Sequence, residues 1–555
     1  TEPRWTPTNA PDKFLNVYVY NVDDVLAESS LDTKVPELDA AEVQVYFLDQ
    51  YINERGVLVD LPRVADAQFL VDEYKNQLEA TCRTMTKSSW DDEDDGFSPT
   101  QREKIAGWIR ENGWPNLLDL QAETVKALVQ RSDVPENIKT MLKLYSTYGM
   151  KAVSKFDTLV AMACSDGALR GMFMYHAANT GRWSSLGVQL QNMYRGALEE
   201  GDDPAVAIEA FIQRSLDLIR LMYPGLDPMK VLASCVRGML VARAGHDLIS
   251  NDFAGIESRV NAWLFDELWK LEAFTAYDNG TGPDLYKVAY ARAFQILVDS
   301  VTKKQRQLGK VMELALGYEG GVGAFITMVT TYGIDLDDMA AQVLPILPED
   351  VIESAEWLWK KQGQKLGVSH DVFIACDGLK QLWRAAHPGI VQGWKDLREA
   401  AEQAVQHPGT AFKIPNGKII FKVVTYGEHQ WLCMRLPSGR KLWYFKPRWD
   451  ADENQLRYMG IDTYTRQYTE TSTYGGKLCE NAVQAISRDL LVHAMFGCED
   501  AGYKIIMTVH DEVVAEVKKG WGSVEEMRQI MRRLPAWAKG LPVDVAGGRM
   551  HRYSK

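Results

Sequence analysis

The sequence predicts an α+β fold in which a mixed or antiparallel sheet is interrupted by large helical insertions. Three observations carry this prediction. Helical patterns dominate the first third of the chain, a strand followed by a helix spans residues 247–266, and two strands close the chain at about residues 503–517. Residues 284–405 between these units are largely helical. We therefore expect the functional site where the two separated halves of the sheet meet.

The N-terminal region begins with an incomplete unit. Apolar residues alternate over residues 14–20, and a brief helix is expected after them. A helical pattern that begins at Ala41 ends near Gly56, because glycine commonly terminates helices. A long helix is predicted over residues 62–85, and further helices extend to about residue 163.

The remaining elements follow from patterns of period two or 3.6 and from turn residues. We expect a strand-turn-strand unit near residues 170–175, a strand at 247–253, a helix at 256–266, β structure over 408–470, a helix at 475–496, and strands at 503–509 and 512–517. Asn416-Gly417 and Ser438-Gly439 mark turns within the β-rich stretch. His510 and Asp511 occupy the turn of the last hairpin.

Composition bounds the class of protein. The chain has 555 residues, of which 46% are hydrophobic and 25% charged, as in ordinary globular proteins. Its net charge of −13 means that binding to nucleic acid would need a locally basic surface. The seven cysteines form no CxxC pair, which argues against a structural zinc site and favours a reducing compartment. No signal peptide or membrane-spanning apolar run is present, and the initial Thr suggests a piece of a longer chain or a removed leader.

Two aspartates occupy positions suited to metal binding. Asp252 ends an apolar strand just before a helix, and Asp511 lies in the turn of a strongly apolar hairpin. Hard oxygen ligands suit Mg²⁺, and two metal ions about 3.5–4 Å apart can activate an attacking hydroxyl and stabilise a leaving phosphate. Taken singly, Asp252 is better explained as a helix cap and Asp511 as a turn residue, so the metal assignment rests on their sequence context.

Three segments supply that context. Asp252 begins the segment Asp-Phe-Ala-Gly-Ile-Glu-Ser-Arg, and Asp511 is central to Val-His-Asp-Glu-Val. Between them lies Arg-Gln-Leu-Gly-Lys, from Arg306 to Lys310, with Tyr318 eight residues further on. Together and in this order, the segments resemble motifs A, B and C of the family A DNA polymerases, which are similar to bacterial DNA polymerase I. The resemblance implies a right-hand polymerase fold with thumb, palm and fingers, and extension of a primer 3′-hydroxyl with dNTPs.

Motif B is consistent with a helix that presents one functional face. Arg306, Lys310, Leu314 and Tyr318 recur every four residues and share that face. Two cations one turn apart could grip a triphosphate, although an amphipathic helix with a solvated basic edge would show the same pattern. The resemblance further implies that Lys310 protonates the leaving pyrophosphate.

The resemblance also assigns the other site residues. It implies two Mg²⁺ ions, with Mn²⁺ as a substitute, held by Asp252, Asp511 and the backbone carbonyl of Phe253, and assisted by Glu512. Glu257 and Tyr318 would exclude a ribonucleotide 2′-hydroxyl, and Tyr286 would lie near the β-phosphate in place of a more usual His. The expected DNA contacts are Arg182 within Thr-Gly-Arg-Trp-Ser-Ser, Gln191 and Asn192 after it, Asn481 and Gln484 on the helix at 475–496, and His510.

The departures from the family pattern indicate which branch of the family the chain resembles most. Leu314 replaces an aromatic residue that packs on the nucleotide sugar in most members, and Gly255 replaces a polar residue. The segment Leu-Pro-Ser-Gly-Arg at residues 436–440 and Gly-Gly-Lys at 475–477 are closest to phage-type members. We therefore expect a monomeric phage replicative polymerase, or a prophage copy of one, that acts on primer-template DNA in the cytoplasm of a bacterial host. A separate exonuclease or replisome proteins are possible partners.

The expected domain division follows the motifs. It comprises a remnant of a proofreading exonuclease domain (1–40), the thumb (41–163), a first palm part with motif A (164–270), the fingers with motif B and a phage-type β-rich insertion (271–470), and a second palm part with motif C (471–555). Tyr20 and Asp24 have the spacing of the last exonuclease motif, but the residues before them cannot supply a nuclease domain. No exonuclease activity is therefore expected from this chain.

Two alternative functions remain open at this point. A single-subunit RNA polymerase shares the palm chemistry, but Glu257 argues against it. A non-catalytic DNA-binding relative of polymerases would be expected to have lost carboxylates or a broken motif B, and neither is seen in this sequence.

Overall fold

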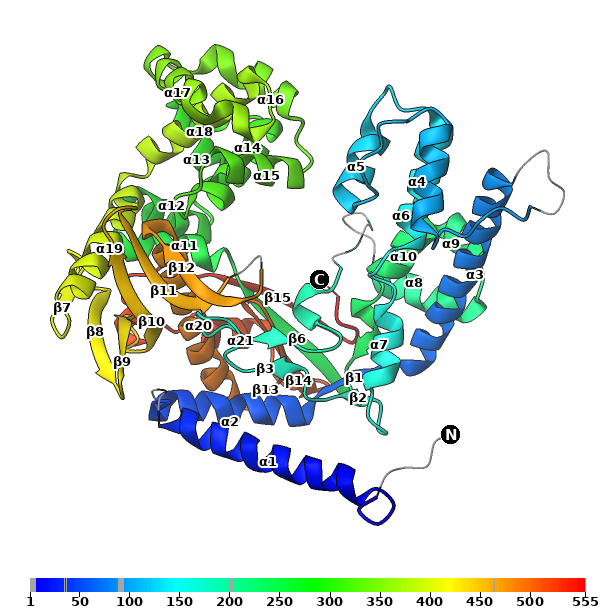
Figure 1. Ribbon diagram of the computed structural model, residues 1–555, viewed down its shortest axis with the longest axis horizontal. Coiled ribbons are helices and arrows are strands. Elements are labelled where there is room, and N and C mark those ends of the chain that lie inside the picture. Colours follow the sequence, from blue (N-terminus) through cyan, green and yellow to red (C-terminus); the bar gives the residue numbers. More distant parts are fainter. Residues whose placement is uncertain are drawn as a thin grey trace.

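The computed structural model describes residues 6–554 with the exception of residues 34, 36, 88–93, 195, 197, 199–202, 463 and 464. Within this part of the chain, helices and antiparallel sheets form the predicted α+β fold. Figure 1 shows two helical groups that stand above a central sheet, one on each side of it.

The central sheet joins the two strand units that the sequence separates. Its strand order is β13-β14-β6-β15, and all its neighbours are antiparallel. The bounds are β6 (His246–Phe253), β13 (Lys504–Val509), β14 (Glu512–Lys518) and β15 (Val545–Met550). Residues Leu248 to Asn251 of β6 and Glu512 to Ala515 of β14 are buried, because α20 (Gly475–Asp500) and α21 (Val524–Met531) pack on this sheet.

The first helical group is formed by the N-terminal third of the chain. Its elements are α2 (Ala40–Arg55), β1 (Val57–Val59), α3 (Leu61–Thr86), α4 (Arg102–Glu111), α5 (Ala122–Gln130), α6 (Glu136–Tyr148) and α7 (Lys155–Met162). The predicted end of α2 is confirmed, since Gly56 follows it with φ 61°. The far end of α3 and helices α4 to α6 bury a hydrophobic core of their own, separate from the main core.

Short elements connect this group to the central sheet. They are β2 (Ala168–Leu169), β3 (Phe173–Met174), β4 (Ser184–Ser185), α8 (Pro204–Ala210), α9 (Leu216–Met222), α10 (Pro228–Ser234) and β5 (Leu240–Val241). β1 pairs with both β2 and β5. The strand-turn-strand unit predicted near residues 170–175 was wrong in its second strand, because β3 pairs with β4 at residues 184–185 and β2 belongs to the other sheet.

The second helical group fills most of the interval between the two halves of the central sheet. Its helices are α11 (Ile256–Leu264), α12 (Leu268–Asp278), α13 (Leu285–Phe294), α14 (Lys303–Leu316), α15 (Val322–Thr331), α16 (Leu336–Val343), α17 (Glu349–Gln362), α18 (His370–Ala386) and α19 (Pro388–Gln406). A six-stranded antiparallel sheet follows, with its strands paired in chain order. Its strands are β7 (Ala411–Lys413), β8 (Ile420–Tyr426), β9 (His429–Arg435), β10 (Lys441–Asp450), β11 (Gln455–Ile461) and β12 (Tyr468–Thr473).

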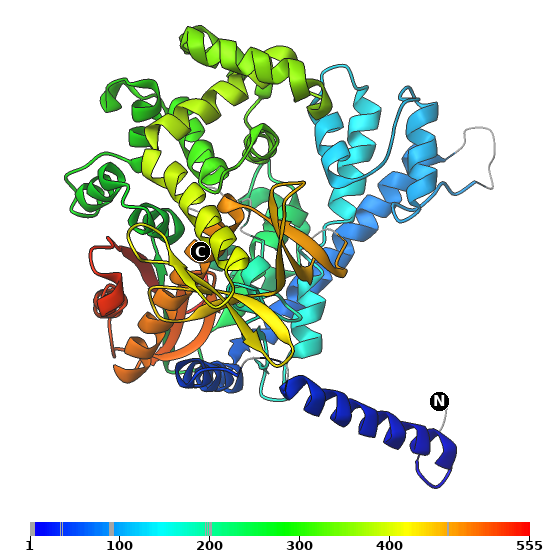
Figure 2. The ribbon, with the colours of Figure 1, turned by 60° about the vertical axis from the view of Figure 1, so that its left-hand side comes forward.

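The prediction for the N-terminal unit was wrong in one respect. Residues 14–20, whose apolar residues alternate, lie inside a single 22-residue helix, α1 (Pro11–Asp32), which has no buried residue. Pro11 favours a helix start because its φ is already helical. Figure 2 shows α1 projecting away from the rest of the molecule. Parts of the expected unit at residues 1–40, namely residues 1–5, 34 and 36, lie outside the described residues.

Three of the expected domain boundaries do not coincide with element ends. Residue 40 is the first residue of α2, residue 270 falls inside α12, and residue 470 falls inside β12. The described helices include none that is both long enough and apolar enough to cross a membrane.

Candidate active site

The two predicted metal ligands lie on adjacent strands of the central sheet. Asp252, near the end of β6, is paired in register with Glu512, the first residue of β14. The backbone N–H of Phe253 donates to the carbonyl oxygen of Asp511 at 3.2 Å. Both aspartates are partly exposed, and the side chain of Asp511 retains 21% of its accessible surface. The fold therefore brings together two carboxylates that are more than 250 residues apart in sequence.

Glu512, expected to assist the metal site, points into the protein. It is 1% exposed, and its carboxylate accepts hydrogen bonds from the Ser250 hydroxyl and from the Tyr553 hydroxyl, the latter at 2.8 Å. Burial and the adjacent Glu512 charge raise the pKa of Tyr553, so that this phenol remains a donor. Glu512 therefore fixes the strand ends on which Asp252 and Asp511 sit.

Arg182 links Asp511, a predicted metal ligand, to Glu257, the residue expected to select the sugar. Its Nη1 lies 2.6 Å from Glu257 Oε1, and its Nη2 lies 3.3 Å from Asp511 Oδ1. Burial acts to lower the pKa of Arg182, but the charges of Asp511 and Glu257 raise it above its ordinary value. The Tyr318 hydroxyl donates to Glu257 Oε2 at 2.7 Å. Burial, and then the Glu257 charge, raise the pKa of Tyr318 well above its ordinary value, so the phenol stays protonated.

The motif B helix, α14, begins with a capping box. The Thr302 side chain accepts from the Gln305 backbone, and the Gln305 side chain accepts from the backbone N–H of Thr302. One turn later, Arg306 Nη2 lies 2.8 Å from Asp284 Oδ2, and its guanidinium lies 5.4 Å from the centre of the Tyr286 ring. The predicted Arg306 and Tyr286 are thus neighbours.

The next turns of α14 carry the other two predicted nucleotide-binding residues. Lys310 Nζ lies 5.0 Å from the centre of the Tyr332 ring, and Leu314 is 42% exposed. Gly309 between the two cations is needed for close packing, because a Cβ there would lie 2.3 Å from the carbonyl oxygen of Tyr286.

The inner side of α14 is fixed by a buried charge cluster that sequence reasoning missed. Glu313 forms an ion pair with Lys270, lies 3.0 Å from His387 Nε2, and accepts from Trp383 Nε1 at 2.9 Å. Although burial acts to raise the pKa of Glu313, the charges of Lys270 and His387 hold it well below the ordinary value. The cluster sets the rotation of α14, and hence the direction in which its functional face points.

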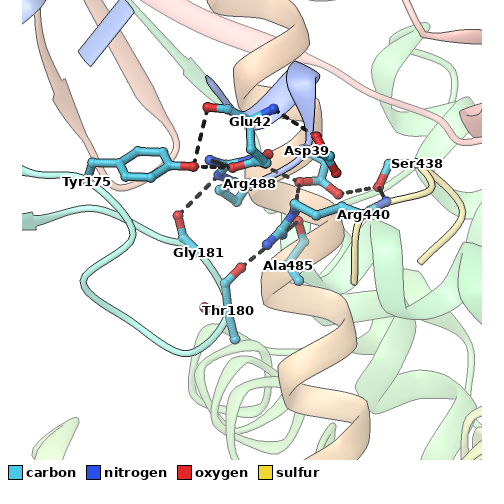
Figure 3. Close-up of polar contacts among 10 residues, drawn as sticks. Asp39, Glu42, Tyr175, Thr180, Gly181, Ser438, Arg440, Ala485 and Arg488 are labelled. Atoms are coloured by element: carbon cyan, nitrogen blue, oxygen red, sulfur yellow. Dashed lines mark hydrogen bonds and ion pairs between the residues drawn. The ribbon is translucent and has the colours of Figure 1, made fainter. Parts of the chain in front are cut away.

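The Thr-Gly-Arg segment is held by two buried arginines (Figure 3). Arg440 Nη2 donates to the carbonyl of Thr180 at 2.9 Å, and Arg488 Nε donates to the carbonyl of Gly181 at 3.1 Å. Arg440 also pairs with Asp489 at 2.6 Å, and Arg488 with Glu42 at 2.6 Å. These carbonyl contacts position the backbone immediately before Arg182.

Sequence reasoning did not assign a role to these arginines, although one signal was present. Arg440 ends the Leu-Pro-Ser-Gly-Arg segment, which had served only as a marker of lineage. Gly181 adopts φ 86°, and a Cβ there would lie 2.5 Å from Arg440 Nη1. A glycine in a left-handed conformation beside a buried arginine therefore links the two motifs physically.

The other predicted DNA contacts form varied local hydrogen bonds. His510, with φ 55° in the hairpin turn, places Nε2 2.9 Å from the carbonyl oxygen of Gln191. Asn192 is exposed next to it. On α20, Asn481 Nδ2 donates to the Tyr444 hydroxyl at 3.0 Å, and Gln484 Nε2 donates to Glu480 at 3.1 Å.

Comparison with solved structures identifies the architecture. The fold resembles the POL domain of Pol1 from M. smegmatis, solved in complex with DNA primer-template and dNTP, with a TM-score of 0.57 and 16% sequence identity over 92% of this chain and 70% of that one. No family model matches the sequence. The predicted α+β, right-hand polymerase fold is confirmed.

Comparison with curated proteins shows the family to which the chain belongs. The DNA polymerase of Bacillus phage SP02 is 30% identical over 559 residues, which covers 99% of this chain and 76% of that protein. The chain belongs to the family A DNA polymerases, and it is a DNA-directed DNA polymerase.

Proposed function

We propose that this polymerase extends a primer 3′-hydroxyl by a two-metal-ion mechanism, with Asp252 and Asp511 as the metal ligands, and that it replicates a phage genome in the cytoplasm of a bacterial host. The observation that carries the assignment is the pairing of β6 with β14, which places the two partly exposed carboxylates at neighbouring strand ends.

The donor set at these strand ends fits Mg²⁺. Among the described residues, no group of three or more His, Cys, Asp or Glu side chains is arranged to hold a metal ion. A donor set of two carboxylates and the backbone carbonyl of Phe253 would leave coordination positions for water and for substrate phosphates, as Mg²⁺ prefers. The Asp511 carboxylate already attracts one cation, the guanidinium of Arg182. When bound, two such ions, or Mn²⁺ in their place, would lower the pKa of the attacking hydroxyl and neutralise charge on the leaving phosphate.

The protein's own groups would bind and orient the triphosphate. Arg306 and Lys310 lie one turn apart on α14, as a pair of phosphate-binding cations requires. Since Arg306 is paired with Asp284 in this structure, the phosphates would compete with that carboxylate for the guanidinium. Lys310, whose ammonium rests on the Tyr332 ring, would donate a proton to the departing pyrophosphate. The Tyr286 hydroxyl would donate a hydrogen bond near the β-phosphate.

Sugar selection would depend on the pair formed by Glu257 and Tyr318. The hydroxyl of Tyr318 and the guanidinium of Arg182 hold the Glu257 carboxylate from two sides. A carboxylate fixed in this way would exclude a 2′-hydroxyl by volume and by an unfavourable desolvation. This selection is consistent with DNA synthesis and gives no support to the RNA polymerase alternative.

Primer-template DNA would pass between the two helical groups. Arg182, Gln191, Asn192, Asn481, Gln484 and His510 would contact it. We assign the thumb to residues 41–163, the palm to the central sheet with its flanking segments, and the fingers to α12–α19 with the six-stranded sheet as an insertion. The boundaries expected at 270 and 470 move to the starts of α12 and α20. A monomer would suffice for this activity.

Primer extension with two substituted proteins tests the metal assignment. We expect Asp252→Asn and Asp511→Asn each to reduce the rate of single-nucleotide incorporation by about 10³-fold or more, because a lost metal ligand removes several kcal/mol of transition-state stabilisation. Affinity for primer-template should change little.

Asp247→Asn is the matched control. Asp247 lies at the other end of β6 and pairs with Arg549 at 2.8 Å, so its loss should leave incorporation unchanged. Extension at the original rate by either substituted metal ligand would refute the assignment.

A further inference from the structure

One face of the six-stranded sheet carries a group of aromatic side chains that the polymerase site does not use. His429 and Trp431 on β9 and Trp443 and Phe445 on β10 occupy alternate positions, and Phe445 pairs in register with Trp431. Their ring centres lie 4.6 Å apart for Trp431 and Phe445, 5.1 Å for His429 and Phe445, and 6.3 Å for Trp431 and Trp443. We name these four residues the aromatic patch.

The aromatic patch lies on the outer face of its sheet. The intervening residues of the same strands, such as Leu432, Met434 and Leu442, are buried, because α19 packs on that side. Trp443 on the patch side is 36% exposed. Since a partly exposed tryptophan surface is costly to leave in contact with water, the patch is a candidate binding surface.

The stretch that contains the patch is basic in an otherwise acidic protein. Residues 411–448 contain eight Lys or Arg residues and one acidic residue, Glu428, whereas the whole chain has a net charge of −13. Lys441 Nζ lies 5.8 Å from the Trp443 ring centre, and Lys446 Nζ lies 5.2 Å from that of Phe445. Neither lysine forms an ion pair with the described residues.

The patch borders a hollow that is also lined by Leu31 and Val35, at and just after the end of α1, and by two residues close to the proposed DNA path. Its volume is about 440 Å³, and its lining includes Trp431 and Trp443 together with Asn179 and Asn481. Asn179 directly precedes the Thr-Gly-Arg segment, and Asn481 is one of the predicted DNA contacts. The indole N–H of Trp431 is buried and has no hydrogen-bond partner among the described residues.

We propose that the aromatic patch and its lysines bind single-stranded DNA, and that the unpaired template strand is the segment bound there. Aromatic rings offer stacking surfaces to every base, and interleaved cations match the phosphates, so binding would be tolerant of sequence as a copying enzyme needs. Binding of single-stranded DNA as such follows from the patch alone. Its identification with the template strand rests on the proposed DNA path.

Equilibrium binding of a fluorescently labelled single-stranded oligonucleotide to the full chain tests this proposal. Trp443→Ala should weaken binding at least fivefold, since stacking contributes about 1–3 kcal/mol per base, and Trp443→Phe should retain most of the affinity. Lys441→Glu should weaken binding and reduce its dependence on salt.

Trp357→Ala provides a matched control. Trp357 on α17 is 58% exposed and has Lys361 at 3.6 Å from its ring, but it lies outside the patch. Its substitution should leave oligonucleotide binding unchanged. Equal affinity of Trp443→Ala and the unsubstituted protein would overturn the proposal and would leave a protein partner as the occupant of the patch.

Primer extension separates this proposal from the proposed catalytic site. On a template with one unpaired base, Trp443→Ala should extend at the normal rate, while on a template with a long unpaired strand its apparent affinity should fall. A loss of activity on both templates would indicate damage to the polymerase site and would also count against the patch. Weaker oligonucleotide binding without any effect of template length would retain the patch and reject the template strand as its ligand.

Discussion

At the scale of single residues, Glu257 is held so firmly that its volume can act as a selector. Replacing Glu257 with Ala opens the space beside Tyr318. We therefore expect the ratio of ribonucleotide to deoxynucleotide incorporation to rise about tenfold or more. A tenfold change corresponds to about 1.4 kcal/mol in activation free energy. Single-turnover incorporation of matched nucleotides measures this ratio. Glu257→Gln keeps the volume without the charge and should retain selection. An unchanged ratio in the Ala variant would exclude the steric role.

Leu314, exposed on the functional face of α14, should influence the choice between normal and terminating nucleotides. In Leu314→Tyr, the phenol hydroxyl would supply a hydrogen bond in place of the one that a terminator cannot make because it lacks the 3′-hydroxyl. Incorporation of 3′-deoxy terminators should therefore rise. One such hydrogen bond corresponds to an increase of about tenfold in the incorporation of terminators. Competition between dNTPs and terminators measures the effect, with Leu314→Phe as the control that has the ring without the hydroxyl. Equal terminator incorporation by all three proteins would contradict the prediction.

At the scale of elements, the buried pair of Glu42 and Arg488 joins α2 to α20. Glu42→Gln removes the charge that compensates a nearly fully buried guanidinium, and we expect a loss of about 3 kcal/mol in unfolding free energy at neutral pH. Burial acts to raise the pKa of Glu42, but Arg488 holds it below its ordinary value. The stabilisation by the pair of Glu42 and Arg488 is therefore fully present above the ordinary pKa of a carboxyl group. It is lost as the pH falls through the lowered pKa of Glu42.

Urea unfolding at neutral and acidic pH measures this contribution. The difference between the unsubstituted protein and Glu42→Gln should be large at neutral pH and should shrink in acid. Glu54→Gln, at an exposed position on the same helix, is the control and should have little effect. A difference that is independent of pH would show that the ion pair does not provide the stability.

Element prediction succeeded where a periodic pattern and a terminating residue agreed. The helix predicted at 62–85 is α3, and the strand predicted at 247–253 is β6, which is also the strand that carries Asp252. It was wrong at α1, because an alternating run of apolar residues is also compatible with a helix whose sides are all exposed. No local pattern could distinguish these cases, since the helix lacks a buried face.

At the scale of the whole molecule, the sequence indicated which residues would meet but not what holds them. Asp252, Glu257, Tyr318 and Arg182 are identifiable from their motifs, and the structure brings them together. Their supports are side chains distant in sequence, such as Tyr553 beneath the strand ends and Arg440 behind the Thr-Gly-Arg segment. Such supports depend on tertiary packing, which spacing along the chain does not encode.

The pairing of β6 with β14 is the feature of the whole molecule on which the proposed mechanism depends, because it brings Asp252 and Asp511, the proposed metal ligands, together from two halves of the chain. Electron paramagnetic resonance with Mn²⁺ measures that site directly in the complex with primer-template and a non-reacting dNTP analogue. We expect tight Mn²⁺ binding by the unsubstituted protein and by Asp247→Asn, and loss of this binding when Asp252 and Asp511 are both replaced by Asn. Retention of the tight sites by the doubly substituted protein would contradict the proposed mechanism.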